Sequence, residues 1–268
     1  MSISPSIKDI REITAALSNR LNVDYSNYAF SFLRRRFAFV YSTLNIKKTD
    51  VFIQQIKSGE VIDDFCYTFP VNDSEMFRGP SFWRTLRVKL LPAMSDNLSF
   101  WFPDLVSAHE LFSLLVILEE EKLIPKAKIF CNVSSIQRIN EIKSGKIKSK
   151  KIEIDKKNFR RLELDSNFED YFTDKDGFLG IDMRLLKNVE FLHGNYFNQI
   201  PAANISIAFF RNRMIYYNGT RQCAAEKYLH QCLGKGAYLV LGIKEKISKV
   251  NERCFSLYDK EEQIYRVM

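Results

Sequence analysis

The most constraining feature of the chain is a strand, turn and helix pattern that contains no glycine. The stretch reads Leu98-Ser-Phe-Trp-Phe-Pro-Asp-Leu-Val-Ser-Ala-His-Glu-Leu-Phe-Ser113, which is the layout of a nucleotide-binding turn. Such turns use glycine because its backbone takes positive φ and lets a ligand approach without a Cβ in the way. The next glycines are Gly79 and Gly145. Either the chain has another fold, or it has this fold with a filled pocket.

The composition is typical of a globular α/β protein. A length of 268 residues with 46% hydrophobic content suits one α/β domain and a small partner domain. The chain has no apolar run of about 18 residues and no signal-peptide pattern at its start, so we expect a cytoplasmic protein without membrane insertion. Its five cysteines form no CxxC pair and its three histidines lack ligand spacing. We therefore expect no metal site and reduced thiols.

The positive charge is unevenly distributed. The segment Lys143–Arg161 holds nine Lys and Arg residues against two acids, in a chain of net charge +8. Such a run is either a contact for nucleic acid or an acidic partner, or a solvated loop. The loop is favoured because blocks of like charge usually stay exposed, and the charges here do not alternate with a repeated pattern of glycine and aromatic residues. Nucleic acid is accordingly not expected as the main partner.

Residues 1–72 predict a small all-α domain. Apolar residues recur at three- and four-residue steps from Ile7 to Leu21, behind Ser6 as an N-cap. A second helix is predicted over about 26–44, with Arg34–Arg36 in its middle, and a third over about 50–57. The three arginines give this domain a basic edge.

Residues 73–268 predict a Rossmann-like α/β domain. Strands are expected at Leu98–Phe102, Ala127–Cys131, Val189–Leu192, Ile205–Phe209 and Ala237–Gly242, and helices at 81–91, Ser107–Glu121, Ser134–Lys143 and Thr220–Leu233. A hairpin of 254–258 and 263–267 closes the chain. Alternating strands and helices indicate a mostly parallel sheet, and the hairpin adds an antiparallel C-terminal strand. Many methyltransferases share this outline.

Four motifs carry a specific resemblance. They are Glu75-Met-Phe-Arg-Gly-Pro-Ser-Phe-Trp83, Asn188-Val-Glu-Phe-Leu-His-Gly-Asn195, Phe210-Arg-Asn-Arg-Met-Ile-Tyr-Tyr-Asn218 and Leu239-Val-Leu-Gly-Ile-Lys-Glu245. In this order, after a small helical domain, they resemble the CheR family. These enzymes use S-adenosylmethionine to esterify glutamates on bacterial chemotaxis receptors.

The resemblance implies roles for particular residues. Arg78 and Tyr216 match family positions beside the transferred methyl group. The cofactor positions are matched by Glu110, Asn195, Arg211 and Asn212. Glu110 has a second interpretation, which we favour: Ser107 and Glu110 have the spacing of a capping box at a helix start. Arg211 and Asn212 are equally well explained as caps of the turn after a strand.

The cofactor motif itself departs from the family pattern. Asp104 and Ala108 stand where the family has glycines, and the acid that binds the cofactor ribose is replaced by Val133 or Asn132. Loss of that carboxylate alone costs about 10- to 150-fold in affinity. Phe102, Pro103, Leu105 and Val106 would fill the vacated space. At a third position near the methyl group, the resemblance places Asp170 where the family has an arginine.

These departures predict millimolar or absent binding of S-adenosylmethionine. The sequence therefore predicts a pseudoenzyme that serves as an interaction module in chemotaxis or receptor signalling, with a protein partner that contacts Arg34–Arg36. The alternative is an active S-adenosylmethionine-dependent methyltransferase that esterifies chemoreceptor glutamates through Arg78 and Tyr216.

Overall fold

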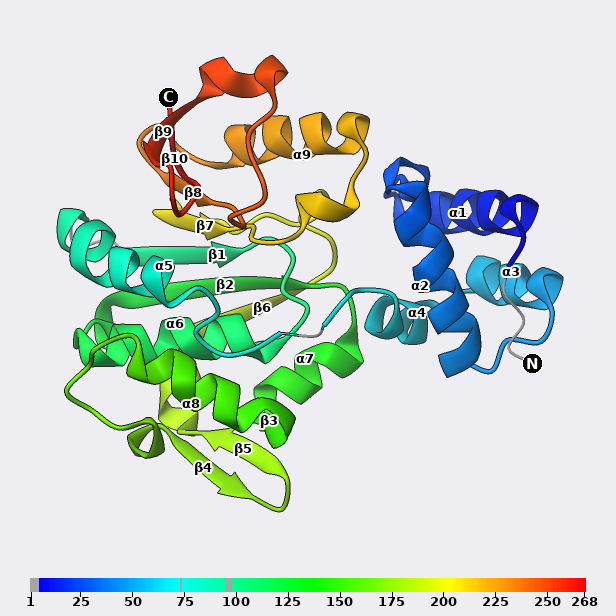
Figure 1. The fold of residues 1–268 in the computed structure, drawn as a ribbon. Coiled ribbons are helices and arrows are strands. Elements are labelled where there is room, and N and C mark those ends of the chain that lie inside the picture. The colour runs from blue at the N-terminus through cyan, green and yellow to red at the C-terminus, as the bar shows by residue number, and fades with distance from the viewer. Residues whose placement is uncertain (1–4, 73, 95–97) are drawn as a thin grey trace.

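The computed structural model describes residues 5–72, 74–94 and 98–268. Four helices come first: α1 (Ile7–Leu21), α2 (Phe30–Thr43), α3 (Thr49–Ser58) and α4 (Ile62–Thr68). They form a bundle to one side of the sheet (Figure 1). Ser6 caps α1 by accepting from the Asp9 amide, as predicted. Helix α2 begins at Phe30 rather than near residue 26, because Tyr28 is paired in an antiparallel bridge with Tyr217.

A central sheet of seven strands follows, in the order β6-β2-β1-β7-β8-β10-β9. Its strands are β1 (Leu98–Phe102), β2 (Ala127–Val133), β6 (Val189–His193), β7 (Ile207–Phe209), β8 (Tyr238–Val240), β9 (Phe255–Asp259) and β10 (Ile264–Val267). The neighbouring strands β6, β2, β1, β7 and β8 pair in parallel. Strand β10 pairs antiparallel with β8 and β9. The predicted fold class, with its antiparallel C-terminal hairpin, is confirmed.

Helices cover both faces of this sheet. They are α5 (Pro80–Thr85), α6 (Ala108–Glu120), α7 (Ile136–Lys143), α8 (Ile152–Arg160) and α9 (Gly219–Cys232). Residues of α5, α6, α7 and α8 belong to one hydrophobic core, whereas those of α9 belong to another. In Figure 1, α6 lies near β2 and β6, and α9 lies at the height of β8 and β10. Every residue of β1 is buried, because Phe100 and Phe102 enter one core and Trp101 enters the other. The predicted helix 81–91 is not uniform, since α5 passes into a π-helical stretch over Leu86–Leu90.

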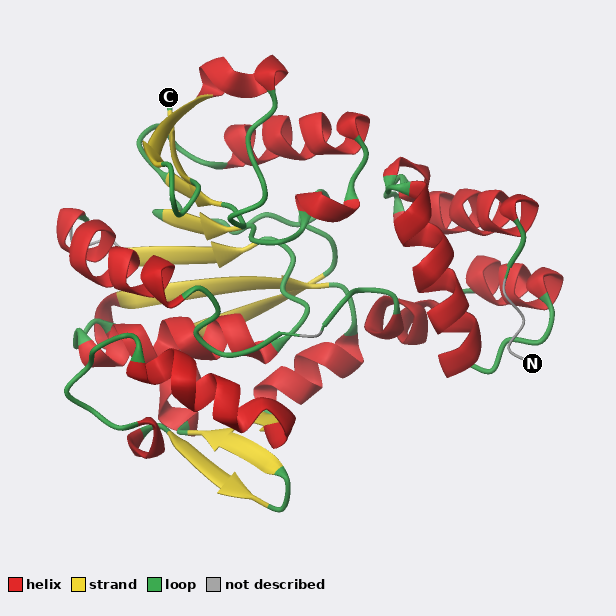
Figure 2. Cartoon of the chain, in the orientation of Figure 1, coloured by secondary structure: helices red, strands yellow, loops and turns green. Residues whose placement is uncertain are grey.

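The basic segment is not a solvated loop, which corrects the interpretation favoured from sequence. It comprises the end of α7, strand β3 (Lys146–Lys148) and α8. Strand β3 joins β4 (Phe172–Lys175) and β5 (Phe178–Ile181) in a separate antiparallel sheet, visible below the main one in Figure 2. The segment is ordered because Ile147 and Phe159 enter the main core.

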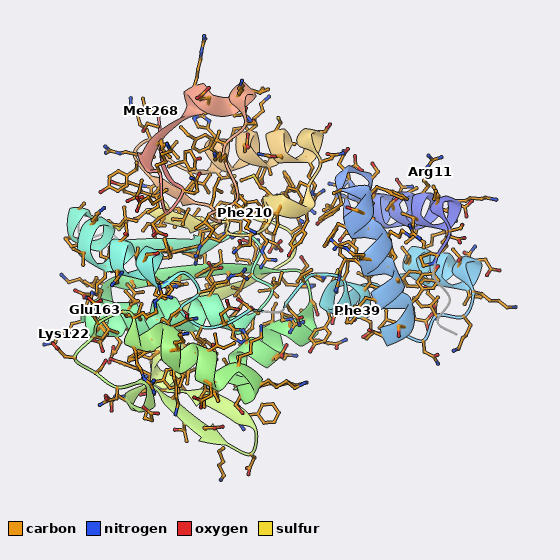
Figure 3. All side chains as sticks on the ribbon, viewed as in Figure 1. Arg11, Phe39, Lys122, Glu163, Phe210 and Met268 are labelled. Carbon is orange, nitrogen blue, oxygen red and sulfur yellow. The ribbon has the colours of Figure 1, made fainter. Side chains whose placement is uncertain are left out.

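The strand order changes direction at β1, which has β2 on one side and β7 on the other. In such sheets ligands bind in the crevice at the carboxyl ends of the strands, where the order reverses. Those ends face the helical bundle in Figure 1. Phe210, which follows β7, is fully buried in the middle of the molecule (Figure 3).

Candidate functional site

Two small pockets lie at the carboxyl ends of β1 and β7. The first, here named the arginine pocket, is lined by Val71, Ser74, Glu75, Arg78, Trp83, Leu105, Val106, Ser107, Glu110, Ser113, Arg211, Asn212, Arg213 and Tyr216. The second, the tyrosine pocket, is lined by Tyr25, Tyr28, Phe32, Cys66, Phe69, Pro70, Asp104, Ser134, Asn195, Tyr196, Arg213, Tyr216, Tyr217 and Arg221. The structure thus brings together all the predicted site residues except Asn195, which lies in the second pocket.

An ion pair organises the arginine pocket. Arg211 Nη1 lies 3.1 Å from Glu110 Oε1, and Arg211 Nη2 donates to the Arg78 carbonyl at 3.0 Å. The same guanidinium lies 4.3 Å from the centre of the Phe82 ring. Gly79 has φ +70°, and a Cβ there would lie 3.2 Å from Arg211 Nη2. Arg211 therefore fixes the backbone of the Arg78 segment, while the Arg78 side chain itself is half exposed.

The capping-box interpretation of Glu110 is wrong. Ser107 is the N-cap residue of α6, but its side chain accepts no capping hydrogen bond. The Glu110 carboxylate pairs with Arg211 instead. A charge-assisted bond to a buried guanidinium is stronger than a hydrogen bond to a helix amide at the surface. The alternative that Arg211 caps its own turn is likewise not observed, because its guanidinium reaches across to Glu110 and Arg78.

The turn after β1 is closed onto the end of β2. The Leu105 amide donates to the Asn132 carbonyl at 2.9 Å. Leu105 and Val106 are buried, and Leu105 belongs to the main hydrophobic core. Asp104 stays at the edge of the turn, with its carboxylate 3.9 Å from Arg213 Nε. The Leu105 amide and side chain are therefore both engaged within the fold.

Strand β2 ends in Asn132 and Val133, so neither chain position at which the resemblance places the ribose-binding acid carries a carboxylate. Val133 is buried. Asn132 is engaged within the fold, since its Oδ1 accepts from Trp101 Nε1 at 2.7 Å and its Nδ2 donates to the Gln199 carbonyl at 2.9 Å. Neither residue is available to a ribose hydroxyl.

The tyrosine pocket is occupied largely by the chain itself. The Arg221 guanidinium lies 4.4 Å from the centre of the Tyr28 ring and 4.7 Å from that of Tyr217. Its Nη1 donates to the Asp24 carbonyl at 2.7 Å. Asn195 forms a local turn, in which its Oδ1 accepts from the Phe197 amide at 2.8 Å. Arg221 thus joins the helical bundle to the sheet domain across the space between them.

Both pockets are small. Their cavity volumes are about 50 Å³ for the arginine pocket and about 40 Å³ for the tyrosine pocket. Pockets that enclose a drug-sized ligand measure roughly 300–1,000 Å³. The side chains of Leu105, Val106 and Arg221 supply the volume that closes them.

Glu245 ends the fourth motif, and its role is visible only in the folded structure. Its buried carboxylate accepts from the amides of Asn212 at 2.8 Å, Ile215 at 3.0 Å and Gly242 at 2.6 Å. Asn212 has φ 56°, a conformation that costs energy for a residue other than glycine. Gly242 is required beside it, since a Cβ there would lie 2.5 Å from Asn212 Oδ1. Glu245 therefore holds the turn that presents Arg211.

Helix α8 holds the segment that precedes Arg78, a role the sequence did not reveal. Asp155 Oδ1 accepts from the Met76 amide at 2.7 Å, and Asn158 Nδ2 donates to the Met76 carbonyl at 2.9 Å. The Phe77 amide donates to Ser113 Oγ at 2.7 Å. The basic segment thus supports one wall of the arginine pocket.

Asp155 gives this contact a pH dependence. Burial raises the pKa of Asp155 to about 6, although the hydrogen bond from the Met76 amide acts to lower it. A raised pKa in the folded state favours the protonated form of Asp155. The stability that the protonated carboxyl contributes is therefore complete below about pH 4 and is lost as the pH rises through 6.

Asp155→Asn keeps an acceptor and removes the charge. We expect the variant to match the wild type at pH 4 and to exceed it in free energy of unfolding by about 1–3 kcal/mol at pH 7. Urea unfolding at both pH values measures this, and a constant difference would contradict it.

Other sequence candidates do not line either pocket. Asp170 caps a turn through the Asn167 amide at 2.7 Å and lines neither pocket. Arg36 is engaged with the end of α4, donating from Nε to the Phe69 carbonyl at 2.7 Å. Of the basic edge of α2, Arg34 and Arg35 are the exposed members.

Comparison with known proteins decides the family. The family described as CheR methyltransferase, SAM binding domain, matches residues 72–264. The chain belongs to the CheR family. A Pseudomonas putida KT2440 protein named "Putative methyltransferase Cher3" is 24% identical over 265 residues, which is 96% of each chain. The resemblance stated from the four motifs is confirmed.

Solved structures of other methyltransferases are more distant. A SAM-dependent methyltransferase from Thiobacillus denitrificans in complex with S-adenosylhomocysteine shows 12% identity and a TM-score of 0.36, covering 66% of this chain and 53% of that one. The N-methyltransferase NodS from Bradyrhizobium japonicum shows 12% identity and a TM-score of 0.34, with 63% of each chain covered. This CheR-family chain spans about half the length of the first of these structures.

The residues of the crevice do not fit S-adenosylmethionine in the manner of the family. The Leu105 amide is bonded to Asn132, strand β2 ends in Asn132 and Val133 in place of the family's acid, and Arg221 lies in the tyrosine pocket. Among the described residues, no group of three or more His, Cys, Asp or Glu side chains could hold a metal ion. In the same part of the chain, no helix is long and apolar enough to cross a membrane.

Proposed function

We propose that this CheR-family protein does not transfer methyl groups and acts as a binding module in chemotaxis or receptor signalling. The observation that carries the proposal is the closed turn after β1, where the Leu105 amide donates to the Asn132 carbonyl at 2.9 Å. A cofactor could enter only if this bond broke and Leu105 left the core. Burial of a leucine is worth roughly 1.5–3 kcal/mol, which such an opening would forfeit.

The retained polar residues are consistent with this proposal because each has a structural role. Arg211 and Glu110 fix the Arg78 backbone, and Glu245 fixes the Arg211 turn. A fold that loses its ligand keeps those side chains that hold its own segments together. The proposed location is the cytoplasm and the proposed partner is a signalling protein, both of which rest on the family.

A methyl-transfer assay tests the proposal. The purified protein is incubated with radiolabelled S-adenosylmethionine and membranes of the source organism, beside a CheR-family enzyme that retains the glycines of the turn. We expect base-labile methyl esters with the control enzyme and none with this protein, because the crevice leaves no room for the methyl donor. Labelled esters above background would contradict the proposal.

The second candidate function is an active methyltransferase that esterifies receptor glutamates. It is favoured by the meeting of Arg78, Tyr216, Glu110 and Arg211 in one pocket. The buried Nε of Arg211 also lacks a hydrogen-bond partner among the described residues. This candidate requires label in the same assay, and that label must disappear in Arg78→Ala, since the half-exposed Arg78 side chain makes few contacts that stabilise the fold.

A further inference from the structure

A basic groove lies beside the arginine pocket and takes no part in the functions above. It is lined by Tyr67, Asn72, Ser74, Ser107, Ala108, His109, Arg138, Glu141, Ile142, Lys146, Ile147, Lys148, Lys150 and Lys151. Its cavity volume is about 320 Å³, compared with about 50 Å³ for the arginine pocket. The groove therefore has room for a ligand, whereas the crevice in which the family binds its cofactor is closed in this chain.

The groove has a strong excess of positive charge. Lys146 and Lys148 are exposed on β3, and Ile147 between them is buried, because alternate residues of a strand point to opposite faces. Lys150 is exposed in the turn that follows. In the described part of the chain, no salt bridge is found for these three lysines. Among the described residues that line the groove, Glu141 is the only acid, and it is bonded to Arg138.

Strand pairing and hydrogen bonds hold the backbone of the groove in place. Strand β3 pairs with β5 from Lys146 opposite Gly180 to Lys148 opposite Phe178. Arg138 is buried, donates to the Tyr67 carbonyl at 3.1 Å and joins α7 to α4. A charged surface that is already ordered loses little backbone entropy when a partner binds.

We propose that this groove docks an acidic polypeptide segment of the protein's partner. The ammonium groups are point charges that suit scattered carboxylates. Single-stranded nucleic acid would need exposed aromatic faces for base stacking, and the aromatic ring of the groove, Tyr67, has the Arg138 guanidinium 4.0 Å from its centre. The excess charge is also confined to Lys143–Arg161 and does not form a long stripe. The proposal rests on the proposed function for its biological meaning and adds the place and chemistry of the contact.

Peptide binding tests the proposal. The probe is a fluorescein-labelled short peptide of alternating glutamate and alanine, titrated by anisotropy at about 50 mM salt without any methyl donor. The variant is Lys146→Gln, Lys148→Gln, Lys150→Gln. The control is Lys227→Gln, Lys235→Gln, Lys249→Gln, which removes the same charge from exposed positions elsewhere. We expect the first variant to weaken binding by at least about tenfold and the control by less than about twofold.

Several results would overturn the proposal. Equal weakening by both variants would show attraction to net charge alone. Tighter binding of an oligonucleotide of equal charge would assign the groove to nucleic acid, and displacement of the peptide by inorganic triphosphate at equal concentration of charge would assign it to a small anion. No methyl donor is present in this experiment. Its outcome therefore does not depend on whether the protein transfers methyl groups, which the methyl-transfer assay tests separately.

Discussion

Glu245→Ala is expected to lower the free energy of unfolding by about 3–5 kcal/mol, because it leaves three buried amides without an acceptor. The amides belong to Asn212, Ile215 and Gly242, and two of them lie in the turn that presents Arg211. Asn212 would keep its positive φ without the bond that compensates for it. The Arg211 contact to Glu110 should therefore weaken together with the turn.

Urea unfolding followed by circular dichroism measures this loss. Glu252→Ala removes an exposed glutamate from the neighbouring segment and should change stability by less than about 0.5 kcal/mol. Glu245→Gln, which keeps one oxygen acceptor, should fall between alanine and the wild type. If Glu245→Ala proved as stable as Glu252→Ala, the carboxylate would not hold the turn.

Arg221→Ala is the second large effect, expected at about 2–4 kcal/mol of lost stability. The substitution removes a buried cation that packs on both the Tyr28 and the Tyr217 ring, and it removes the hydrogen bond to the Asp24 carbonyl. These contacts join the helical bundle to the sheet domain. Their loss should loosen the bundle while the sheet domain keeps its own core.

Limited proteolysis distinguishes this local loosening from general instability. Cleavage within residues 69–72, after α4, should become faster in Arg221→Ala than in the wild type, because opening of the interface exposes this stretch. Arg253→Ala, an exposed arginine in the C-terminal region, serves as the control. Equal cleavage rates in the three proteins would mean that the interface does not depend on Arg221.

The sequence predicted the elements whose apolar pattern is local. The strands β1, β2 and β6 and the terminal hairpin are runs of apolar or alternating residues, and their order along the chain was sufficient for the fold class. The small sheet was missed, although Asp176-Gly177 lies between β4 and β5 with φ values of 54° and 76°. An Asp-Gly pair between two short apolar runs is a strong hairpin signal.

Helix α8 was missed for a different reason. One of its inward positions is Asp155, which breaks the apolar periodicity and is satisfied by the Met76 amide far away in the sequence. The Glu110 error has the same origin, since its partner Arg211 is distant in the chain and local spacing suggested a cap. Contacts of this kind depend on the tertiary fold, so sequence patterns alone do not reveal them.

The most direct test of the account is isothermal titration of the wild-type protein with S-adenosylhomocysteine and S-adenosylmethionine. The closed turn at Leu105 and the absence of an acid at the described end of β2 predict no saturable heat up to about 1 mM ligand, which is less than about 4 kcal/mol of binding free energy. Binding of either compound at micromolar concentration, near 8 kcal/mol, would show that the crevice opens and would contradict the account.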